Sequence, residues 1–250
     1  MSTAFIRSVE IKGEGVDRRS YPLRLPAFRG VQTLDLDPRM TILVGENGSG
    51  KSTLVEGIAV AAGFNAEGGT TNFNFATQRH RPELATHLRL IRGTRRPRTG
   101  FFLRAESFFN VASEIERLDN EPSIAARIGP AYGPRPLHEV SHGESFLSLA
   151  LHRFGRDGLY ILDEPEAAMS PVGCLALVRR FHELVLHGSQ FVIATHSPIM
   201  MAFPGALIYV LSQSGPHRSE WDELEHVKVL KEFMNHRDVV IGELFSNGDS

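Results

Sequence analysis

Apolar and polar residues alternate along the first part of the chain, between turn-forming Gly, Pro and Asp residues. Three such segments predict strands: residues 5–13 (FIRSVEIKG), 21–28 (YPLRLPAF) and 31–37 (VQTLDLD). Residues 40–45 (MTILVG) are almost entirely apolar, as expected for a strand that is buried on both faces. The pattern therefore predicts an antiparallel N-terminal β flank that leads into a buried strand.

Further along, apolar runs alternate with helical patterns. Strands are predicted within residues 159–166 (LYILDEPE), 190–198 (QFVIATHSP) and 206–213 (ALIYVLSQ), and a helix is predicted over residues 171–188. One face of a further predicted helix, residues 221–236, is mostly apolar and carries Leu224, Val227, Leu230, Lys231 and Met234. The alternation of strand and helix predicts an α/β fold with a mostly parallel core sheet.

Two segments in the middle of the chain are predicted to pair as a hairpin. They are residues 83–93 (ELATHLRLIRG) and 100–110 (GFFLRAESFFN), joined by residues 94–99 (TRRPRT). The arginines of this hairpin are Arg89, Arg92, Arg95, Arg96, Arg98 and Arg104. At the tip they would contact a phosphate backbone or an acidic partner, or simply form a solvated surface. Residues 111–136 suggest a small helical insert that ends in a Pro/Gly-rich linker.

Composition narrows the function classes. The chain has 250 residues, of which 42% are hydrophobic and 22% charged, and its formal net charge is −2, so contact with nucleic acid would require a local basic patch. The only cysteine, Cys174, excludes an intrachain disulfide and is typical of a reducing compartment. Because no signal core and no membrane-spanning apolar run are present, we expect a cytoplasmic protein that does not enter a membrane.

A glycine-rich loop follows the strand predicted over residues 40–45. Gly45, Gly50, Lys51 and Ser52 have the spacing of a phosphate-binding loop, and a helix is predicted from Lys51 onward. Glycines let backbone N–H groups turn toward phosphate oxygens. Lys51 would contact the β- and γ-phosphates, and the hydroxyl of Ser52 would bind Mg²⁺. The candidate nucleotide-binding residues of this loop are Gly45, Glu46, Asn47, Gly48, Ser49, Gly50, Lys51, Ser52 and Thr53.

Polar residues also follow two of the predicted strands. Asp163 and Glu164 end the strand within residues 159–166. In a phosphate-loop protein, one such carboxylate holds Mg²⁺ and its neighbour polarises the attacking water. We therefore assign Asp163 as a metal ligand and Glu164 as the general base. His196 follows the next predicted strand, where it would contact a γ-phosphate or serve as an ordinary capping residue.

In chain order, the segments GENGSGKST, VSHGE, LYILDEPE and IATHSP resemble the Walker A, signature, Walker B and switch-histidine motifs of the ATP-binding-cassette (ABC) ATPases. The segment DEPEAAMSP is more similar to stand-alone, RecF-like or OLD-like ATPases than to transporter cassettes. Together with GFFLRAESFFNVAS and SHGESF, it is similar to small bacterial ATPases of the AAA-15/AAA-21 type. The resemblance implies one ABC-type P-loop ATPase domain over residues 1–250. It also implies a small helical subdomain over residues 107–155 that carries the signature motif.

The resemblance further implies a homodimer that encloses two ATP molecules. In the family, the signature loop binds the γ-phosphate of the ATP held by the other subunit, so Ser141 would supply a hydroxyl and Gly143 a backbone N–H. The following helix would direct its dipole at the phosphate. His142 and Glu144 depart from the usual Leu-Ser-Gly-Gly-Gln signature, and Ser170 stands where the D-loop aspartate is usual.

Two other family elements have candidates only. The glutamine of the Q-loop is not evident, and the candidates for its position are Glu106, then Ser107, and then Gln78. Tyr21 is a candidate for stacking on the adenine ring.

Three functions are compatible with these residues. The leading hypothesis is a Mg²⁺-dependent ATPase whose ATP-driven dimerisation switches a partner protein or a nucleic-acid transaction. The second is a nucleotide-gated binding module with negligible turnover, which the altered signature leaves open. The third is the energising subunit of a transporter, against which the missing Q-loop glutamine and the DEPE sequence both argue.

Overall fold

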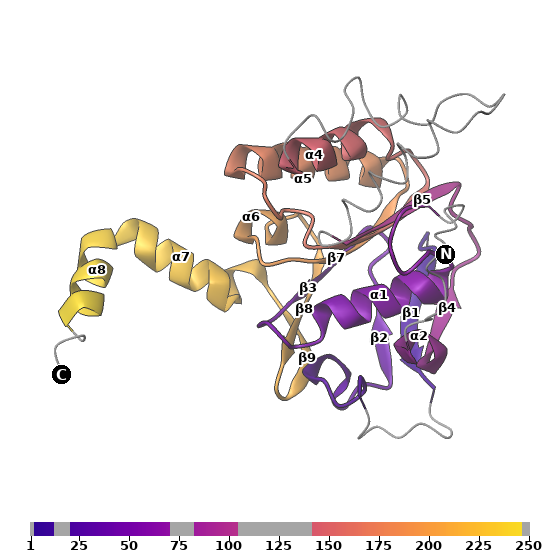
Figure 1. Cartoon of the computed structure of the whole chain (residues 1–250), viewed down its shortest axis with the longest axis horizontal. Helices are drawn as coiled ribbons and strands as arrows, with labels where there is room; N and C mark the ends of the chain where they lie inside the picture. Colours follow the sequence, from indigo (N-terminus) through magenta and orange to yellow (C-terminus); the bar gives the residue numbers. More distant parts are fainter. Residues whose placement is uncertain (1–2, 13–20, 71–82, 105–141, 247–250) are drawn as a thin grey trace.

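The computed structural model describes residues 3–12, 21–70, 83–104 and 142–246, which form two sheets and the helices packed on them (Figure 1). A six-stranded sheet lies at the centre, in the order β5–β6–β7–β3–β8–β9. Its strands are β3 (Met40–Val44), β5 (Thr99–Arg104), β6 (Gly158–Asp163), β7 (Gln190–Ala194), β8 (Leu207–Ser212) and β9 (Gly215–Ser219). The strands from β5 to β8 pair in parallel, and β9 pairs antiparallel with β8. The predicted α/β fold with a mostly parallel core sheet is therefore confirmed.

A smaller antiparallel sheet forms the predicted N-terminal flank. Its order is β2 (Thr33–Asp35), β1 (Ile6–Ile11) and β4 (Leu88–Arg92). A short helix, α2 (Glu83–His87), leads directly into β4. The alternating pattern thus identified β1 and β2 correctly, because each of these strands has one face covered and the other partly exposed.

The strand predicted over residues 21–28 is wrong. This segment forms turns and a short 3₁₀ helix, η1 (Pro26–Phe28). Pro22 and Pro26 have no N–H group to donate to a strand ladder, and their fixed φ favours turns. The amide of Ala27 instead donates a hydrogen bond to the carbonyl of Ser49 (2.9 Å), so the segment supports the glycine-rich loop.

The predicted hairpin of residues 83–93 and 100–110 is also wrong. Strand β4 pairs with β1 in the small sheet, whereas β5 pairs in parallel with β6 in the central sheet. Phe101, Phe102 and Leu103 are all buried, which is typical of a strand covered on both faces and not of an exposed hairpin arm. The segment between β4 and β5 therefore connects two sheets.

The expected arginine-bearing tip is not formed, because β4 and β5 do not pair with each other. Several of these arginines instead pair with nearby carboxylates. The pairs are Arg89 with Glu10, Arg95 and Arg98 with Asp157, and Arg104 with Glu56. Arg95 also lies over the ring of Phe5, with 5.1 Å between its guanidinium carbon and the ring centroid. The basic stretch is thus partly explained by contacts within the fold.

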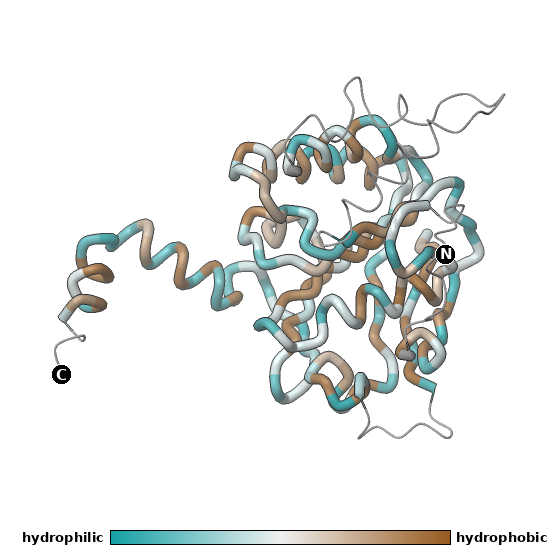
Figure 2. Tube along the Cα trace, viewed as in Figure 1, coloured by the Kyte–Doolittle hydropathy of each residue, from teal (hydrophilic) through white to brown (hydrophobic). Residues whose placement is uncertain are grey.

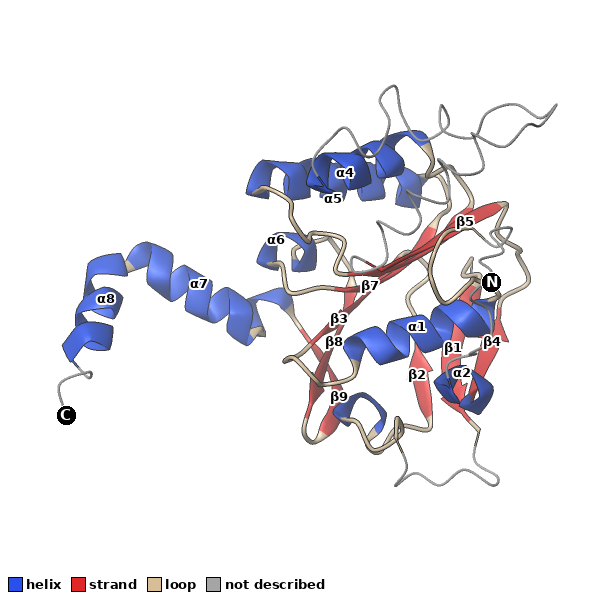
Figure 3. Cartoon of the chain, in the orientation of Figure 1, coloured by secondary structure: helices blue, strands red, loops and turns tan. Residues whose placement is uncertain are grey.

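Helices cover both faces of the central sheet (Figures 1 and 3). They are α1 (Lys51–Ala62), α4 (His142–His152), α5 (Pro171–Leu186) and α6 (Pro198–Met201). Alternate residues of β3 separate two apolar cores: Ile42 and Val44 pack with α4 and α5, whereas Leu43 packs with α1 and β1. Figure 2 shows apolar residues concentrated along the central strands. Both faces of the sheet are therefore buried, as the continuous apolar runs predict.

The C-terminal helices extend away from this body (Figure 1). The apolar face predicted for α7 (Glu225–Asn235) is buried only at its start, at Leu224 and Val227, while Leu230 and Met234 are 44% and 72% exposed. The next helix, α8 (Arg237–Ser246), buries none of its residues. No helix in the described ranges is both long and apolar enough to cross a membrane.

Candidate functional site

The glycine-rich loop connects the end of β3 to the start of α1. Gly50 has φ +97° at the N-cap of α1, a left-handed conformation that favours glycine. A Cβ added to Gly45 would lie 2.8 Å from the carbonyl oxygen of Leu211, so a larger residue would displace the loop from β8. Glu46, Asn47 and Gly48 are exposed. The other predicted loop residues, Gly45, Ser49, Gly50, Lys51, Ser52 and Thr53, are buried or half-buried in the same loop and the first turn of α1.

Lys51 is 4% exposed and its ammonium is held by the loop. Its Nζ donates hydrogen bonds to the carbonyl oxygens of Gly45 (2.7 Å) and Glu46 (3.0 Å). Burial lowers the pKa of Lys51, and the negative charges of Glu164 and Asp163 oppose this shift. A cation at this position is available to a phosphate that the loop amides bind.

Ser52 and Asp163 meet across the loop, as the sequence predicts. Ser52 Oγ donates a hydrogen bond to Asp163 Oδ1 (3.1 Å), and Asp163 is 6% exposed at the end of β6. Hydroxyl and carboxylate oxygens are the ligands that Mg²⁺ prefers, together with phosphate oxygens of a substrate. The described residues contain no group of three His, Cys, Asp or Glu side chains that could hold a metal ion, so a cation here would depend on the bound phosphates.

Glu164 and His196 face each other beside Asp163. His196 Nε2 lies 3.7 Å from Glu164 Oε1, and both side chains are partly exposed. Glu164 has φ +51°, and its amide donates a hydrogen bond to the carbonyl of Ala194 (2.9 Å), which links the ends of β6 and β7. Burial lowers the pKa of His196, and the charge of Lys51 lowers it further against the opposing effect of Glu164. These effects favour a neutral imidazole.

Glu166 is a site residue that the sequence did not identify. Its Oε1 accepts three hydrogen bonds, from Thr195 Oγ1 (2.6 Å), the amide of His196 (2.8 Å) and the amide of Ser197 (3.0 Å). The donors lie 29 to 31 residues away in the chain, so no local pattern connects them to Glu166. The only signal was its place in the segment LYILDEPE.

A cavity of about 320 Å³ opens beside the loop and brings Tyr21 into the site. Its lining includes Tyr21, Leu25, Lys51, Ser52 and Glu164 together with loop glycines. Tyr21 is 56% exposed, so its ring is accessible. Stacking of this ring on a base stays a prediction.

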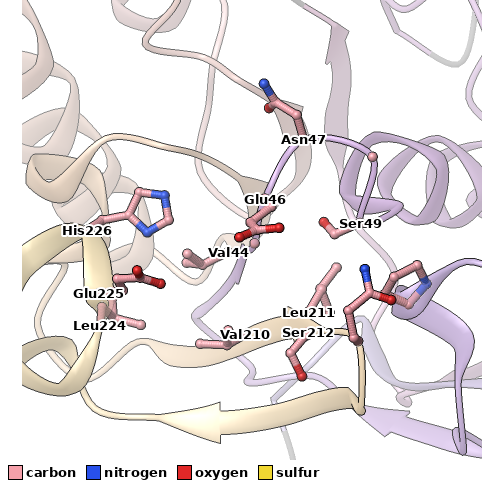
Figure 4. A pocket seen from close by; sticks show the side chains of 14 residues that line it. Val44, Glu46, Asn47, Ser49, Val210, Leu211, Ser212, Leu224, Glu225 and His226 are labelled. Carbon is pink, nitrogen blue, oxygen red and sulfur yellow. The ribbon is translucent and has the colours of Figure 1, made fainter. Parts of the chain in front are cut away.

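A second cavity, about 340 Å³, lies between the glycine-rich loop and the start of α7 (Figure 4). Figure 4 shows Glu46 and Ser49 on one side of it and Glu225 and His226 on the other. The ring centroids of His226 and His196 are 5.8 Å apart. The first turn of α7 is therefore a neighbour of the site.

The signature segment lies apart from this group. Figure 1 places α4 together with α5, across the central sheet from α1. A Cβ added to Gly143 would lie 2.6 Å from the carbonyl oxygen of Ala168, so a glycine is needed where α4 meets the loop before α5. Ser170, at the D-loop position, caps α5 by accepting a hydrogen bond from the amide of Gly173 (3.1 Å).

A third cavity, about 440 Å³, is lined by the start of α4 and the start of α5, including Gly143, Glu144, Ser170 and Val172. The predicted residues Ser141, Glu106, Ser107 and Gln78 lie outside the described residues, as does most of the subdomain predicted over residues 107–155. Within the described part of the chain, the structure thus gathers Lys51, Ser52, Asp163, Glu164 and His196 at one place and leaves Gly143 at another.

Comparisons with known proteins agree with these motifs. Residues 19–119 match the family model "AAA domain", and residues 95–202 match "AAA domain, putative AbiEii toxin, Type IV TA system". A protein of Methanothermobacter marburgensis named "Putative ABC transporter ATP-binding protein" is 32% identical over 82 residues, which are 32% of this chain. The match spans only 30% of the length of that relative.

Solved structures with low sequence identity are also similar. The SMC head domain from Thermotoga maritima is 15% identical, with 86% of this chain and 98% of that chain covered and a TM-score of 0.43. The protein cbiO1 from Clostridium perfringens, described as part of the ABC transporter complex cbiONQ, is 13% identical, with 96% and 99% covered and a TM-score of 0.47. The ordered motifs, the parallel sheet that carries them and the two family-model matches together support an ABC-type ATPase.

Proposed function

We propose that the chain hydrolyses ATP with the help of Mg²⁺ and that it does so as a dimer. The observation that carries this proposal is the meeting of Lys51, Ser52, Asp163, Glu164 and His196 at the carboxyl ends of three neighbouring strands, β3, β6 and β7. In parallel α/β sheets, ligands bind at this edge.

The loop and the first turn of α1 would hold the phosphates of ATP. Backbone amides between Gly45 and Ser52 supply donors, and the N-terminus of α1 supplies a partial positive charge. Lys51 Nζ, which contacts loop carbonyls, would exchange part of these contacts for phosphate oxygens. The ring of Tyr21, at the same cavity, would stack on the base.

Ser52 and Asp163 would hold Mg²⁺ through their side-chain oxygens. The 3.1 Å hydrogen bond between them places a hydroxyl and a carboxylate oxygen together on the phosphate side of the loop. Bound Mg²⁺ would neutralise negative charge on the β- and γ-phosphates. Asp163 is buried and fixed by β6, so this carboxylate needs little reorganisation to act as a ligand.

Glu164 would act as the general base. Its side chain is 43% exposed, so water can reach it, and it accepts a proton as the water oxygen attacks the γ-phosphorus and the bond to the ADP oxygen breaks. His196 lies on the other side of this carboxylate and, in its neutral form, would donate a hydrogen bond to the γ-phosphate. Both roles depend on the hydrogen bond from the amide of Glu164 to the carbonyl of Ala194, which joins the ends of β6 and β7.

The second half of the site would come from another copy of the chain. Gly143 is buried and Glu144 exposed at the start of α4, and both line a cavity shared with the start of α5. A helix N-terminus is an anion site that can act on a phosphate held by a partner subunit. The dimer would then couple ATP binding and hydrolysis to a partner protein or a nucleic-acid transaction.

The test is the substitution Glu164→Gln, which keeps the shape of the side chain and removes its basicity. We expect steady-state phosphate release to fall about 100-fold or more, with ATP affinity retained. Light scattering should then detect an ATP-dependent dimer that persists in the variant. Glu220→Gln, at an exposed glutamate far along the chain, serves as the control and should behave like the parent. Parent-like hydrolysis by Glu164→Gln would refute the assignment of the base.

If the parent itself releases no phosphate but dimerises with ATP, the chain is a nucleotide-gated binding module. The altered signature, with Glu144 near a partner's phosphate, is the feature that supports this second reading. A third function, the energising subunit of a transporter, is supported by the name of the Methanothermobacter relative. Co-purification of the tagged chain with an integral membrane protein would favour it over the other two.

A further inference from the structure

The side chain of Glu166 connects the end of β6 to the loop that follows β7. We propose that Glu166 is a positioning residue for hydrolysis, which holds the loop of residues 195–197 so that His196 faces Glu164. This proposal rests on the proposed function, because it gives Glu166 a task in the same reaction.

The three donors that converge on Glu166 Oε1 belong to consecutive residues. Thr195 contributes its hydroxyl, and His196 and Ser197 contribute their backbone amides. Hydrogen bonds to a carboxylate are stronger than those between neutral groups, so one oxygen fixes both the backbone and a side chain of this loop. The hydroxyl of Thr195 also accepts a hydrogen bond from the amide of Ser197 (3.0 Å), which closes the loop around the carboxylate.

The segment that follows β6 and the segment that follows β7 are thereby joined at two points. The amide of Glu164 donates to the carbonyl of Ala194, and Glu166 accepts from the next three residues. The contact between Glu164 and His196 lies between these two links. Loss of the second link would leave the amides of His196 and Ser197 without the acceptor that Glu166 provides, so the distance of the imidazole from the γ-phosphate would vary.

The second carboxylate oxygen indicates that Glu166 does more than stabilise the loop. Its Oε2 is buried and has no hydrogen-bond partner in the described part of the chain. A buried, unpaired carboxylate oxygen is costly, and a role in packing alone would not require it. The charge of Glu166 also raises the pKa of both Lys51 and His196, which opposes the effect of burial on each group. Glu166 therefore acts electrostatically on two residues of the site without lying among the predicted phosphate ligands.

The experiment compares Glu166→Ala and Glu166→Gln in the full chain, each in the parent and in the His196→Ala background. In the parent, we expect Glu166→Ala to lower kcat about 10- to 100-fold, because three hydrogen bonds are lost, while KM for ATP changes less than about twofold. Glu166→Gln retains an acceptor oxygen for the loop but removes the charge, so its kcat should lie between those of Glu166→Ala and the parent. In the His196→Ala background, Glu166→Ala should lower kcat further by less than about threefold, because both residues act through the same loop.

A purely structural role gives different results. Equal losses of kcat in both backgrounds, or a parallel rise in KM, would overturn the proposal, as would unchanged kcat in Glu166→Ala. Amide hydrogen exchange provides a readout that does not need hydrolysis. In Glu166→Ala, exchange should accelerate in residues 195–201 and stay unchanged in residues 40–62, whereas faster exchange throughout the chain would overturn the proposal. If the parent has no ATPase activity, the proposed function fails, and the exchange result alone decides whether Glu166 holds the loop.

Discussion

The two halves of the proposed site differ in how completely one chain builds them. Around the glycine-rich loop, Lys51 and Asp163 are buried, and their hydrogen-bond partners come from the loop and from the first turn of α1. At the signature half, Glu144 is exposed and Val172 is 75% exposed, on the rim of an open cavity. The first half carries the residues proposed to hold the phosphates, whereas the second half presents an exposed surface that the proposal assigns to contact with a second copy of the chain.

Because of this difference, substitutions in the two halves should affect different steps of the reaction. A change at the loop half removes interactions that exist within one chain, so nucleotide binding itself should be lost. A change at the signature half leaves the fold and nucleotide binding of the monomer intact and affects only steps that need a second copy. The following substitutions test this separation, beginning with the largest expected effect.

Lys51→Ala should have the largest effect. It removes the buried ammonium that the loop carbonyls hold, so we expect the Kd for ATP to rise at least about 100-fold and hydrolysis to be lost. Titration with a fluorescent ATP analogue measures the binding. Lys228→Ala is the control, because this lysine is 55% exposed and forms an ion pair with Glu223 on the surface. An unchanged Kd in Lys51→Ala would place the nucleotide elsewhere.

Val172→Arg should have an intermediate effect that is confined to hydrolysis. A bulky charge at the rim of the signature cavity opposes the docking of a second copy, so we expect kcat to fall about tenfold or more while the Kd for ATP stays within about twofold. Leu186→Arg is a matched control, since Leu186 is 71% exposed at the other end of the same helix. Equal activities of the two variants would mean that this surface does not contribute to the site.

Tyr21→Ala should have the smallest effect of the three. Loss of a stacking ring at the edge of the loop cavity should raise the Kd for ATP about 2- to 10-fold, with kcat at saturating ATP unchanged. Tyr21→Phe retains the ring and should bind ATP like the parent. If Tyr21→Phe loses as much affinity as Tyr21→Ala, the hydroxyl and not the ring makes the contact.

Parts of the site could be predicted because they are contiguous in the chain. The spacing of Gly45, Gly50, Lys51 and Ser52 is local, and it brings the loop amides together at the start of a helix regardless of the rest of the fold. The end of an apolar strand likewise indicated where Asp163 and Glu164 would lie. The roles of these residues remain predictions until the variants above are measured.

Other parts could not be predicted because their partners are distant in sequence. Glu166 precedes α5 in the chain, and its hydrogen-bond donors follow that helix. No pattern within a short window therefore contains Glu166 together with its donors. The hairpin error has the same cause: β4 and β5 are adjacent in the chain, yet their partners are β1 and β6. The apolar stripe of α7 correctly predicted a helix, but it also suggested that the whole stripe is buried, whereas Leu230 and Met234 are exposed.

The helices and strands that depend on local patterns could be predicted from the amino-acid sequence alone. Period-two and continuous apolar runs defined most strands, and glycine spacing defined the phosphate-binding loop, because backbone geometry and side-chain periodicity act over a few residues. The pairing of most strands, and the hydrogen bonds that Glu166 accepts from the loop around His196, became apparent only from the tertiary structure. Most of these contacts join residues distant in the chain, and their formation depends on the packing of both faces of the central sheet.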